Sequence, residues 1–317
     1  MNNLDKIGVC SRSFSRNPVL RKELLSKFSN VKFNDQGISL NGNDLIEFLS
    51  DCDGAIVALE YIDKTTLEQL PNLKFIGKYG VGLDKLDFDA LDEHGVKLGW
   101  TPGVNATSVA ELTLNMSLNI VRNTPASNAL AEQKNWKQVT GKQLSSLTIG
   151  VLGLGHVGTK VAGLFNAFGC KVIAHDILNK GLECEQLGIK QVNFQNLLKD
   201  SDLLTIHIPG NESTFHIIGA HEIGQMKEGS FIVNTARGGI VDEKAIIEAL
   251  NTQKIASVGF DVLEVEPPKN LDFINHPNTF VTTHIGGSSE EAILAMGFAA
   301  IDGLSNYTNA SVFKKYK

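Results

Sequence analysis

The segment that most constrains the fold is a glycine-rich run in the middle of the chain, Gly153-Leu154-Gly155-His156-Val157-Gly158. An apolar, β-branched run at 147–152 precedes it and predicts a buried parallel strand, and apolar residues recur at helical spacing over 161–168. A second expected strand, 170–176, ends in Asp176, 23 residues after Gly153. Strand, glycines, helix and acid in this order are typical of a βαβ unit that binds a dinucleotide.

Each glycine of the run has its own physical reason. Gly153 permits the tight turn, Gly155 lets the backbone approach a pyrophosphate, and Gly158 allows the helix to pack closely on the strand. The N-terminus of the helix that follows supplies free N–H groups and a positive partial charge for the phosphates.

Asp176 favours one dinucleotide over the other. A carboxylate at the end of this strand accepts hydrogen bonds from the adenosine ribose and repels a 2′-phosphate. Ile177 follows where an NADP site often places an arginine. The pair therefore predicts NAD as the cofactor; the alternative is that Asp176 merely caps the next loop.

Length and composition describe an ordinary globular protein. The 317 residues are enough for two domains, each with a full core, and 42% hydrophobic and 20% charged residues are average values. A net charge of -6 without a Lys/Arg run argues against nucleic acid as a partner.

The N-terminal segment and the spacing of the cysteines favour a cytoplasmic protein. The N-terminal segment Met1-Asn2-Asn3-Leu4-Asp5-Lys6 lacks the apolar core of a signal peptide, and no run of 18 apolar residues predicts a membrane span. Cys10, Cys52, Cys170 and Cys184 have no zinc-ligand or redox spacing, so we expect buried thiols and no metal site.

Strand and helix patterns alternate on both sides of a break at Thr101-Pro102-Gly103. Expected strands before the break are 7–10, 31–33, 55–59, 75–77 and 96–100. Further strands are expected at 203–208, 231–234, 257–262 and 280–284, after the two around the glycines. Each βα series predicts an α/β domain with a doubly wound parallel sheet.

Two helices connect the two series. A long helix with an apolar face over 109–121 leads into the second series, and a helix from Ser289 onward is expected to return to the first. The resulting organisation is a discontinuous substrate-binding domain, residues 1–101 plus 290–317, with an NAD-binding domain, residues 102–289, inserted into it.

Residues of the kind found in catalytic sites lie at the ends of three expected strands. Arg237 lies between small residues, Glu266 precedes two prolines, and His284 precedes two glycines. Ligands of an open α/β sheet bind at these ends. Hydride transfer to a 2-keto acid needs an arginine to grip the carboxylate, a histidine to move the hydroxyl proton, and an acid to hold that histidine. Taken singly, each could instead be a surface ion pair, a structural histidine or a solvated loop acid.

Beyond these residues, ordered motifs run through most of the chain. They are Tyr79-Gly80-Val81-Gly82-Leu83-Asp84, Thr101–Ala106, Ser108–Thr113, the glycine run, His207-Ile208-Pro209, Asn234–Gly239, Val241-Asp242-Glu243, Asp261–Pro267 and His284-Ile285-Gly286. Together with the steps of 29 residues from Arg237 to Glu266 and 18 from Glu266 to His284, they resemble the D-isomer-specific 2-hydroxyacid dehydrogenases. The phosphoglycerate dehydrogenase-like subgroup is the most similar.

The resemblance implies a Rossmann NAD-binding domain inserted into a flavodoxin-like substrate domain, a homodimer, and an active site in the interdomain cleft. It makes His284 the general acid/base, Glu266 its orienting partner and Arg237 the carboxylate clamp. The substrate-binding residues that it implies are Lys78, Tyr79, Gly80, Val81, Gly82 and Arg237. The cofactor contacts that it implies beyond Gly153, Gly155, Gly158 and Asp176 are His156, Val157, Ile177, His207, Ile208, Pro209, Thr235, Ala236, Arg237, Asp261, His284 and Gly286. His207 and Asp261 could instead simply terminate strands.

Some positions depart from the family. Thr283 replaces the proline that commonly precedes the catalytic histidine, and the chain has no room for the regulatory domain of longer phosphoglycerate dehydrogenases. Where some phosphoglycerate enzymes carry Arg-x-Arg, this chain has Ala58-Leu59-Glu60, and Glu60 would repel a substrate phosphate. Arg12 or Lys78 could supply the missing charge, or both could be solvated surface cations.

Several substrates and one other function class are compatible with these patterns. The substrate expected is a small 2-hydroxy or 2-keto acid: 3-phosphoglycerate, glycerate/hydroxypyruvate or a glyoxylate-like acid. The main alternative is an NAD(H)-sensing corepressor of the C-terminal-binding type, which shares the fold and the three residues. A formate dehydrogenase is disfavoured because an amide replaces the acid at the position of Glu266. The L-lactate/malate type is disfavoured because its glycine run lies near the N-terminus.

Overall fold

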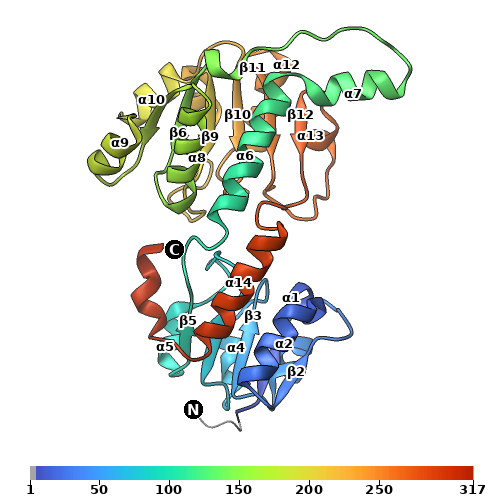
Figure 1. Ribbon diagram of the computed structural model, residues 1–317, viewed down its shortest axis with the longest axis vertical. Helices are drawn as coiled ribbons and strands as arrows, with labels where there is room; N and C mark the ends of the chain where they lie inside the picture. The colour runs from blue at the N-terminus through green and yellow to red at the C-terminus, as the bar shows by residue number, and fades with distance from the viewer. Residues whose placement is uncertain (1–4, 317) are drawn as a thin grey trace. The chain divides into compact units, whose positions relative to one another are not determined.

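The computed structural model describes residues 5–316 and divides into two compact units (Figure 1). Met1–Asn105 and Gly287–Lys317 form the first unit, and Ala106–Gly286 forms the second. The first four residues of the segment inspected for a signal peptide lie outside the described residues, as does the last residue of the chain. The chain passes between the units at 105–106 and at 286–287, where the sequence predicts boundaries at 101–102 and 289–290.

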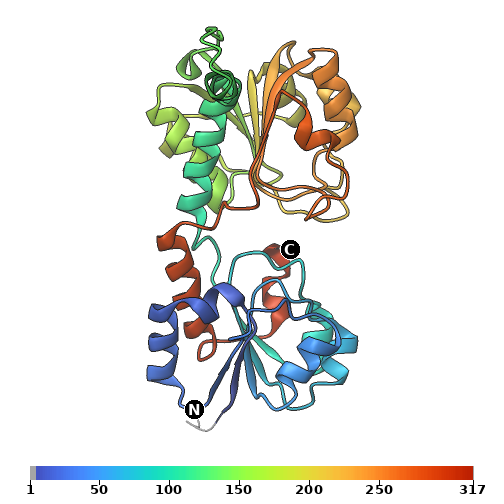
Figure 2. The same cartoon turned by 90° about the vertical axis from the view of Figure 1, so that its right-hand side faces the viewer.

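The first unit contains a five-stranded parallel sheet in the order β2-β1-β3-β4-β5. Its strands are β1 (Ile7–Val9), β2 (Val31–Phe33), β3 (Gly54–Val57), β4 (Phe75–Lys78) and β5 (Lys97–Gly99). One face packs against α3 (Asn43–Leu49), α4 (Lys64–Glu68), α5 (Phe88–Glu93) and the 3-10 helix η2 (Ala310–Tyr316). The other face packs against α1 (Arg12–Arg16), α2 (Pro18–Lys27) and α14 (Glu290–Gly303) (Figure 2).

Helix α14 lies directly on the two last strands of this sheet. A Cβ on Gly77 would come within 2.2 Å of the carbonyl oxygen of Ala300, and one on Gly99 within 2.0 Å of that of Gly303. Both positions lack a side chain, so helix and sheet backbones touch. The last long helix is therefore an integral layer of the unit that begins the chain.

The second unit contains a seven-stranded parallel sheet in the order β12-β11-β10-β9-β6-β7-β8. Its strands are β6 (Thr148–Leu152), β7 (Lys171–His175), β8 (Lys190–Gln191), β9 (Leu203–Ile206), β10 (Ser230–Asn234), β11 (Ile255–Phe260) and β12 (Thr279–Val281). The strand order reverses between β6 and β9, and an open α/β sheet binds ligands at such a switch point. The doubly wound fold expected from the sequence is confirmed for both sheets.

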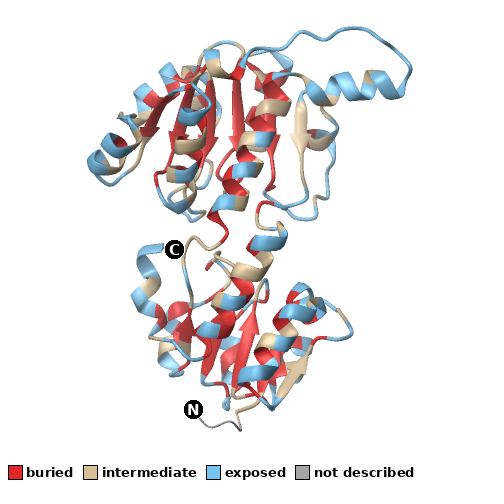
Figure 3. Cartoon of the chain, viewed as in Figure 1, coloured by how far each residue is buried: buried red, intermediate tan, exposed pale blue. Residues whose placement is uncertain are grey.

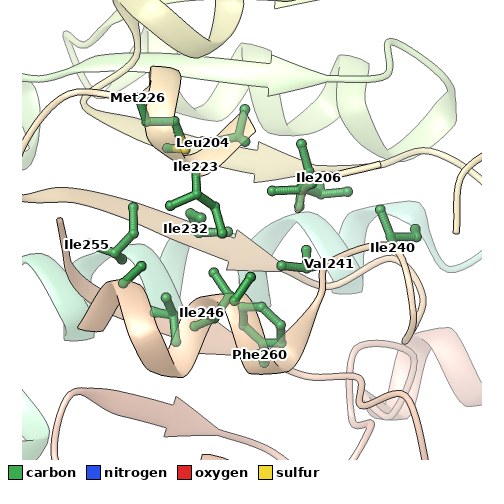
Figure 4. Packing of buried hydrophobic residues seen from close by; sticks show 14 of the residues in the cluster. Leu204, Ile206, Ile223, Met226, Ile232, Ile240, Val241, Ile246, Ile255 and Phe260 are labelled. Carbon is green, nitrogen blue, oxygen red and sulfur yellow. The ribbon is translucent and has the colours of Figure 1, made fainter. Parts of the chain in front are cut away.

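Two apolar layers enclose this sheet. One contains α6 (Ala106–Val121), α8 (His156–Ala167), α9 (Gly181–Leu187) and the 3-10 helix η1 (Leu144–Ser146). The other contains α10 (Phe194–Asp200), α11 (Ala220–Gln225), α12 (Glu243–Asn251) and α13 (Asp272–Asn275). Figure 4 shows the second layer, where Ile206 and Ile232 of the sheet face Ile246 of α12. Because both faces of these parallel strands are buried, their sequences are nearly continuous apolar runs.

The sequence predicted no range for several elements of the second unit. Among them are the two-residue edge strand β8 and α7 (Thr124–Glu132). Several strands are also shorter than expected: the strand expected to reach 208 ends at Ile206, and the one expected to reach His284 ends at Val281. The residues beyond each strand form the loops at the carboxyl edge of the sheet.

Within residues 5–316, the helices are too short or too polar to reach across a lipid bilayer. All four cysteines are free and buried, as expected from their spacing.

Candidate active site

The loop between β6 and α8 leaves open space in front of the helix N-terminus. Gly153 has φ +94°, and a Cβ there would lie 2.7 Å from the carbonyl oxygen of His207. A Cβ on Gly158 would lie 1.8 Å from the carbonyl oxygen of Gly153, whereas one on Gly155 would meet nothing within 4 Å. Two glycines are thus required by packing, and the third borders free space beside the first N–H groups of α8. The residues present fit a pyrophosphate at this position.

Asp176 follows β7 and faces the glycine loop. Its Oδ2 accepts the N–H of Leu154 at 2.8 Å, and its Oδ1 accepts the N–H of Leu178 at 2.9 Å. The carboxylate therefore does cap its own loop, and it also ties that loop to the glycine turn. A carboxylate oxygen accepts more than one hydrogen bond, so both retain capacity for ribose hydroxyls. Ile177 beside it is 95% exposed.

His207 follows β9 and supports the glycine turn from the neighbouring strand. Its Nε2 lies 2.8 Å from Thr205 Oγ1, and its Nδ1 is buried without a hydrogen-bond partner among the described residues. Burial lowers the pKa of His207 to about 3, so the ring is neutral at physiological pH. Ile208 is half-buried and Pro209 exposed in the loop that continues from it.

A turn closed by Asn234 follows β10 and carries Arg237. The amide oxygen of Asn234 accepts the N–H of Ala236 at 3.0 Å, and its Nδ2 donates to the carbonyl oxygen of Arg237 at 2.9 Å. Buried Thr235 lies 2.8 Å, oxygen to oxygen, from Thr113 of α6. A guanidinium N–H of Arg237 donates to the carbonyl oxygen of Ala236 at 2.7 Å.

His284 and Glu266 form a hydrogen-bonded pair. His284 Nδ1 lies 2.8 Å from Glu266 Oε2, and Glu266 Oε1 accepts the N–H of Leu263 at 2.9 Å. The hydrogen bond to Glu266 raises the pKa of His284 despite its partial burial, and nearby Arg237 opposes this rise. Burial alone would raise the pKa of Glu266, but hydrogen bonds from His284 and Leu263 lower it overall, with Arg237 adding to the effect. Both shifts favour the state in which His284 is protonated and Glu266 is ionised.

Asp261, almost fully buried after β11, holds the turn that carries His284. Its carboxylate accepts Thr282 Oγ1 at 2.5 Å and the N–H groups of Ile285 at 2.7 Å and Gly286 at 2.8 Å. Its carbonyl oxygen accepts the N–H of His284 at 2.9 Å. These bonds fix the turn that contains Thr283, the position where the resemblance implied a proline.

The loop after β4 belongs to the first unit. Lys78 is 4% exposed, and its ammonium donates to the carbonyl oxygens of Ala58 at 2.7 Å and Tyr79 at 3.1 Å. The interpretation of Lys78 as a solvated surface cation is therefore wrong. Buried Glu60 turns back to accept the N–H of Ala58 at 2.5 Å. Arg12, in contrast, is exposed at the start of α1.

Backbone N–H groups of this loop are available to an anion. Gly80 has φ +103°, and the N–H groups of Gly80, Val81 and Gly82 have no acceptor within the described part of the chain. Tyr79 is buried beside them, and its hydroxyl accepts Ser13 Oγ at 3.3 Å. Consecutive N–H groups of this kind bind carboxylates and phosphates.

Several polar residues for which the sequence predicted no role support the loops at the carboxyl edge of the second sheet. They are Thr113, Thr205, Asn234 and Thr282. Thr113 and Asn234 lie within motifs already named for the resemblance, whereas Thr205 and Thr282 could have been identified only as polar residues in or beside an apolar run. Arg237, Glu266 and His284 lie in this unit, whereas Lys78 to Gly82 lie in the other.

A parallel sheet with a glycine loop at its switch point and an acid after the next strand defines an NAD-binding protein. The family model "D-isomer specific 2-hydroxyacid dehydrogenase, NAD binding domain" matches residues 114–286. The chain belongs to this family, and its cofactor is NAD.

Named relatives cover most of the chain. It is 38% identical over 81% of its length to the D-3-phosphoglycerate dehydrogenase of Methanocaldococcus jannaschii, of which the match covers 50%. It is 35% identical over 83% of its length to the hydroxypyruvate reductase of Thermotoga maritima, of which the match covers 87%. The crystal structure of a glyoxylate reductase from Paecilomyes thermophila superimposes with a TM-score of 0.85 at 28% identity, covering 99% of this chain and 97% of that one. The chain thus spans about half the length of the phosphoglycerate dehydrogenases it matches.

Proposed function

We propose that this protein is an NAD-dependent oxidoreductase that interconverts a D-2-hydroxy acid and the corresponding 2-keto acid. The hydrogen bond between His284 Nδ1 and Glu266 supports the proposal most strongly. It occupies one ring nitrogen and leaves Nε2 to exchange a proton with the substrate oxygen. The bound nicotinamide supplies or accepts the hydride.

Each charged side chain has a distinct task in this mechanism. In the reductive direction, protonated His284 donates its proton to the carbonyl oxygen as that oxygen gains negative charge. Glu266 stabilises the imidazolium and fixes the tautomer after the proton has left. Arg237 binds the substrate carboxylate through its planar pair of donors and polarises the adjacent carbonyl. The N–H groups of Gly80, Val81 and Gly82, in the first unit, are also proposed to bind a substrate carboxylate.

The cofactor residues belong to the same proposal. Gly153, Gly155, Gly158, His156 and Val157 hold the pyrophosphate, and Asp176 with Ile177 holds the adenosine. The nicotinamide half is lined by His207, Ile208, Pro209, Thr235, Ala236, Arg237, Asp261, His284 and Gly286. For Asp261 the contacts described above give a further task, because its carboxylate holds the turn of His284.

Small unphosphorylated 2-keto acids are the first candidate substrates. The backbone of Ala58 binds both Lys78, the cation suggested for a phosphate, and Glu60, the acid expected to repel one. Neither side chain is thus presented as a free charge to a phosphate. Relatives of this chain are named hydroxypyruvate reductase and glyoxylate reductase, which agrees with hydroxypyruvate and glyoxylate.

We also propose a homodimer and a cytoplasmic location. Helix α7 has no buried residue, and every residue from 131 to 143 is exposed, including Trp136 at 86% (Figure 3). A nine-residue helix is marginal in water by itself, and packing against a second copy would stabilise it. Four buried free thiols suit a reducing compartment.

The decisive experiment compares NADH oxidation by wild type and by the His284→Gln variant with hydroxypyruvate, glyoxylate, phosphohydroxypyruvate and larger keto acids. We expect turnover by the wild type and a loss of about 10²–10⁴-fold in the variant, the usual contribution of a general acid. NADH binding, measured by fluorescence titration, should change by no more than a few-fold. Turnover that persists in the variant would exclude this mechanism.

The same experiment addresses the corepressor alternative, which the named relatives do not favour because they are dehydrogenases and reductases. NADH binding by the wild type without turnover of any keto acid would favour that alternative.

A further inference from the structure

A carboxylate on α12 anchors the segment that carries Glu266. Glu243 begins this helix, and its Oε1 accepts the N–H of Glu264 at 2.7 Å. Glu264 lies only two residues before Glu266. Glu266 in turn accepts the N–H of Leu263 with Oε1 and is bonded to His284 with Oε2. Two successive backbone N–H groups, those of Leu263 and Glu264, are therefore held by two different carboxylates.

The same segment is held on its other side. A Cβ on Gly238 would lie 1.9 Å from the carbonyl oxygen of Leu263, so the turn after Arg237 touches the segment directly. His216 Nε2 lies 3.2 Å from Glu264 Oε2, and the N–H of His216 donates to the carbonyl oxygen of Gly239 at 2.7 Å. The segment is thus bound by Glu243 on the side of α12 and contacted by the turn at Gly238 on its other side.

We propose that Glu243 is a positioning residue, which sets the place of the Glu266 carboxylate against His284 Nδ1 by fixing the backbone at Glu264. The proposal rests on the function proposed above. A hydrogen bond at 2.8 Å weakens steeply when one partner moves by 1 Å, and misplacement of that size can cost about 100-fold in rate.

The proposed role of Glu243 depends on the length of its side chain more than on its charge. The charged or titratable groups facing it are Glu264, His216 and Asp242, and burial raises the pKa of Glu243. Its Oε1 can accept the N–H of Glu264 whether or not the carboxyl is ionised. A glutamine amide oxygen at the same distance would do the same, whereas an aspartate, shorter by one methylene, would not reach.

Two substitutions separate these possibilities. In Glu243→Asp the charge and the favourable interaction with the helix N-terminus remain, but the carboxylate withdraws by about 1.5 Å. In Glu243→Gln the charge is lost and the acceptor stays. We expect kcat for keto-acid reduction to fall about tenfold in Glu243→Asp, and Glu243→Gln to remain within about twofold of wild type. Glu248→Ala, an exposed position on the same helix, is the matched control.

A second measurement does not depend on turnover. NMR titration of the His284 ring, assigned with His284→Gln, should show its pKa moving toward the ordinary value in Glu243→Asp and staying raised in Glu243→Gln. The groups that face His284 are Glu266, Asp261 and Arg237, and all three are present in each variant. Comparable midpoints of thermal unfolding would show that each variant is folded.

The results distinguish the two proposals. Wild-type kcat and His284 pKa in Glu243→Asp, or equal damage in Glu243→Gln, would overturn the positioning role. Absence of turnover in the wild type would instead refute the proposed function, while the His284 titration would still decide the role of Glu243.

Discussion

His284 shows what residue-level reasoning could and could not provide. The sequence indicated this histidine, an acid and an arginine from their positions at expected strand ends. It did not indicate that His284 has φ +58°, an uncommon conformation for a residue with a side chain. Such a conformation persists only where the surroundings fix it, and here Asp261 does so from 23 residues away. A contact between two loops of this kind leaves no local pattern in the sequence.

The raised pKa of His284 gives a pH dependence with a defined sign. Reduction needs the imidazolium, so kcat/KM for keto-acid reduction should be constant at low pH and fall as pH rises through the pKa of His284, above 6.5. Oxidation of the hydroxy acid needs the neutral His284 ring, so kcat/KM in that direction should rise as pH rises through the same pKa.

In Glu266→Gln the ring loses the partner that raises its pKa, so the reductive limb should move to lower pH. Rates with NADH and hydroxypyruvate between pH 5 and 10 measure the reductive limb in the wild type and in the variant. A limb that stays in place in Glu266→Gln would mean that another group controls it.

At the scale of elements, the pattern of apolar runs predicted both sheets but not where each strand stops. Ile208 and Pro209 extend an apolar run past the end of β9 at Ile206, although they belong to a loop. Apolar character cannot separate the end of a strand from apolar residues kept for a ligand. Helix α7 was missed for the opposite reason, because a helix without a buried residue has no apolar stripe facing a core.

The β6–α8 connection allows a test with two closely spaced substitutions. Gly155→Ala adds a Cβ to open space at φ -77°, so folding should be unaffected, while the methyl group occupies the position proposed for the pyrophosphate. We expect NADH to bind at least about tenfold more weakly, which corresponds to about 1.4 kcal/mol.

Gly158→Ala should behave differently, because its Cβ would lie 1.8 Å from a backbone oxygen. We expect it to lower stability as well as binding, by about 1–3 kcal/mol for an overpacked site. Fluorescence titration and thermal unfolding separate the two effects. Unchanged NADH affinity in a folded Gly155→Ala would argue against a pyrophosphate at this turn.

For the whole molecule, the exposed segment 131–143 and α7 are the features that a single chain does not explain. The homodimer proposed above would cover this segment. Light scattering should give the mass of two chains for the wild type, and Trp136→Glu should shift the mass toward one chain at micromolar concentration.

Tyr61→Glu, at a 57% exposed aromatic residue in the first unit, is the matched control and should remain dimeric. A monomeric wild type would refute the dimer, and a dimeric Trp136→Glu would place the interface elsewhere.

The contact of α14 with Gly77 and Gly99 has a consequence for synthesis on the ribosome. The five strands of the first sheet emerge early, but one of the helices that cover their second face is separated from them by the whole of Ala106–Gly286. Domains generally fold in the order in which they are translated, yet here the second unit is complete before the first has its last layer. The apolar surface around Ile56 and Phe75 thus stays partly uncovered while about 180 further residues are made, a stage at which a nascent chain depends on chaperones.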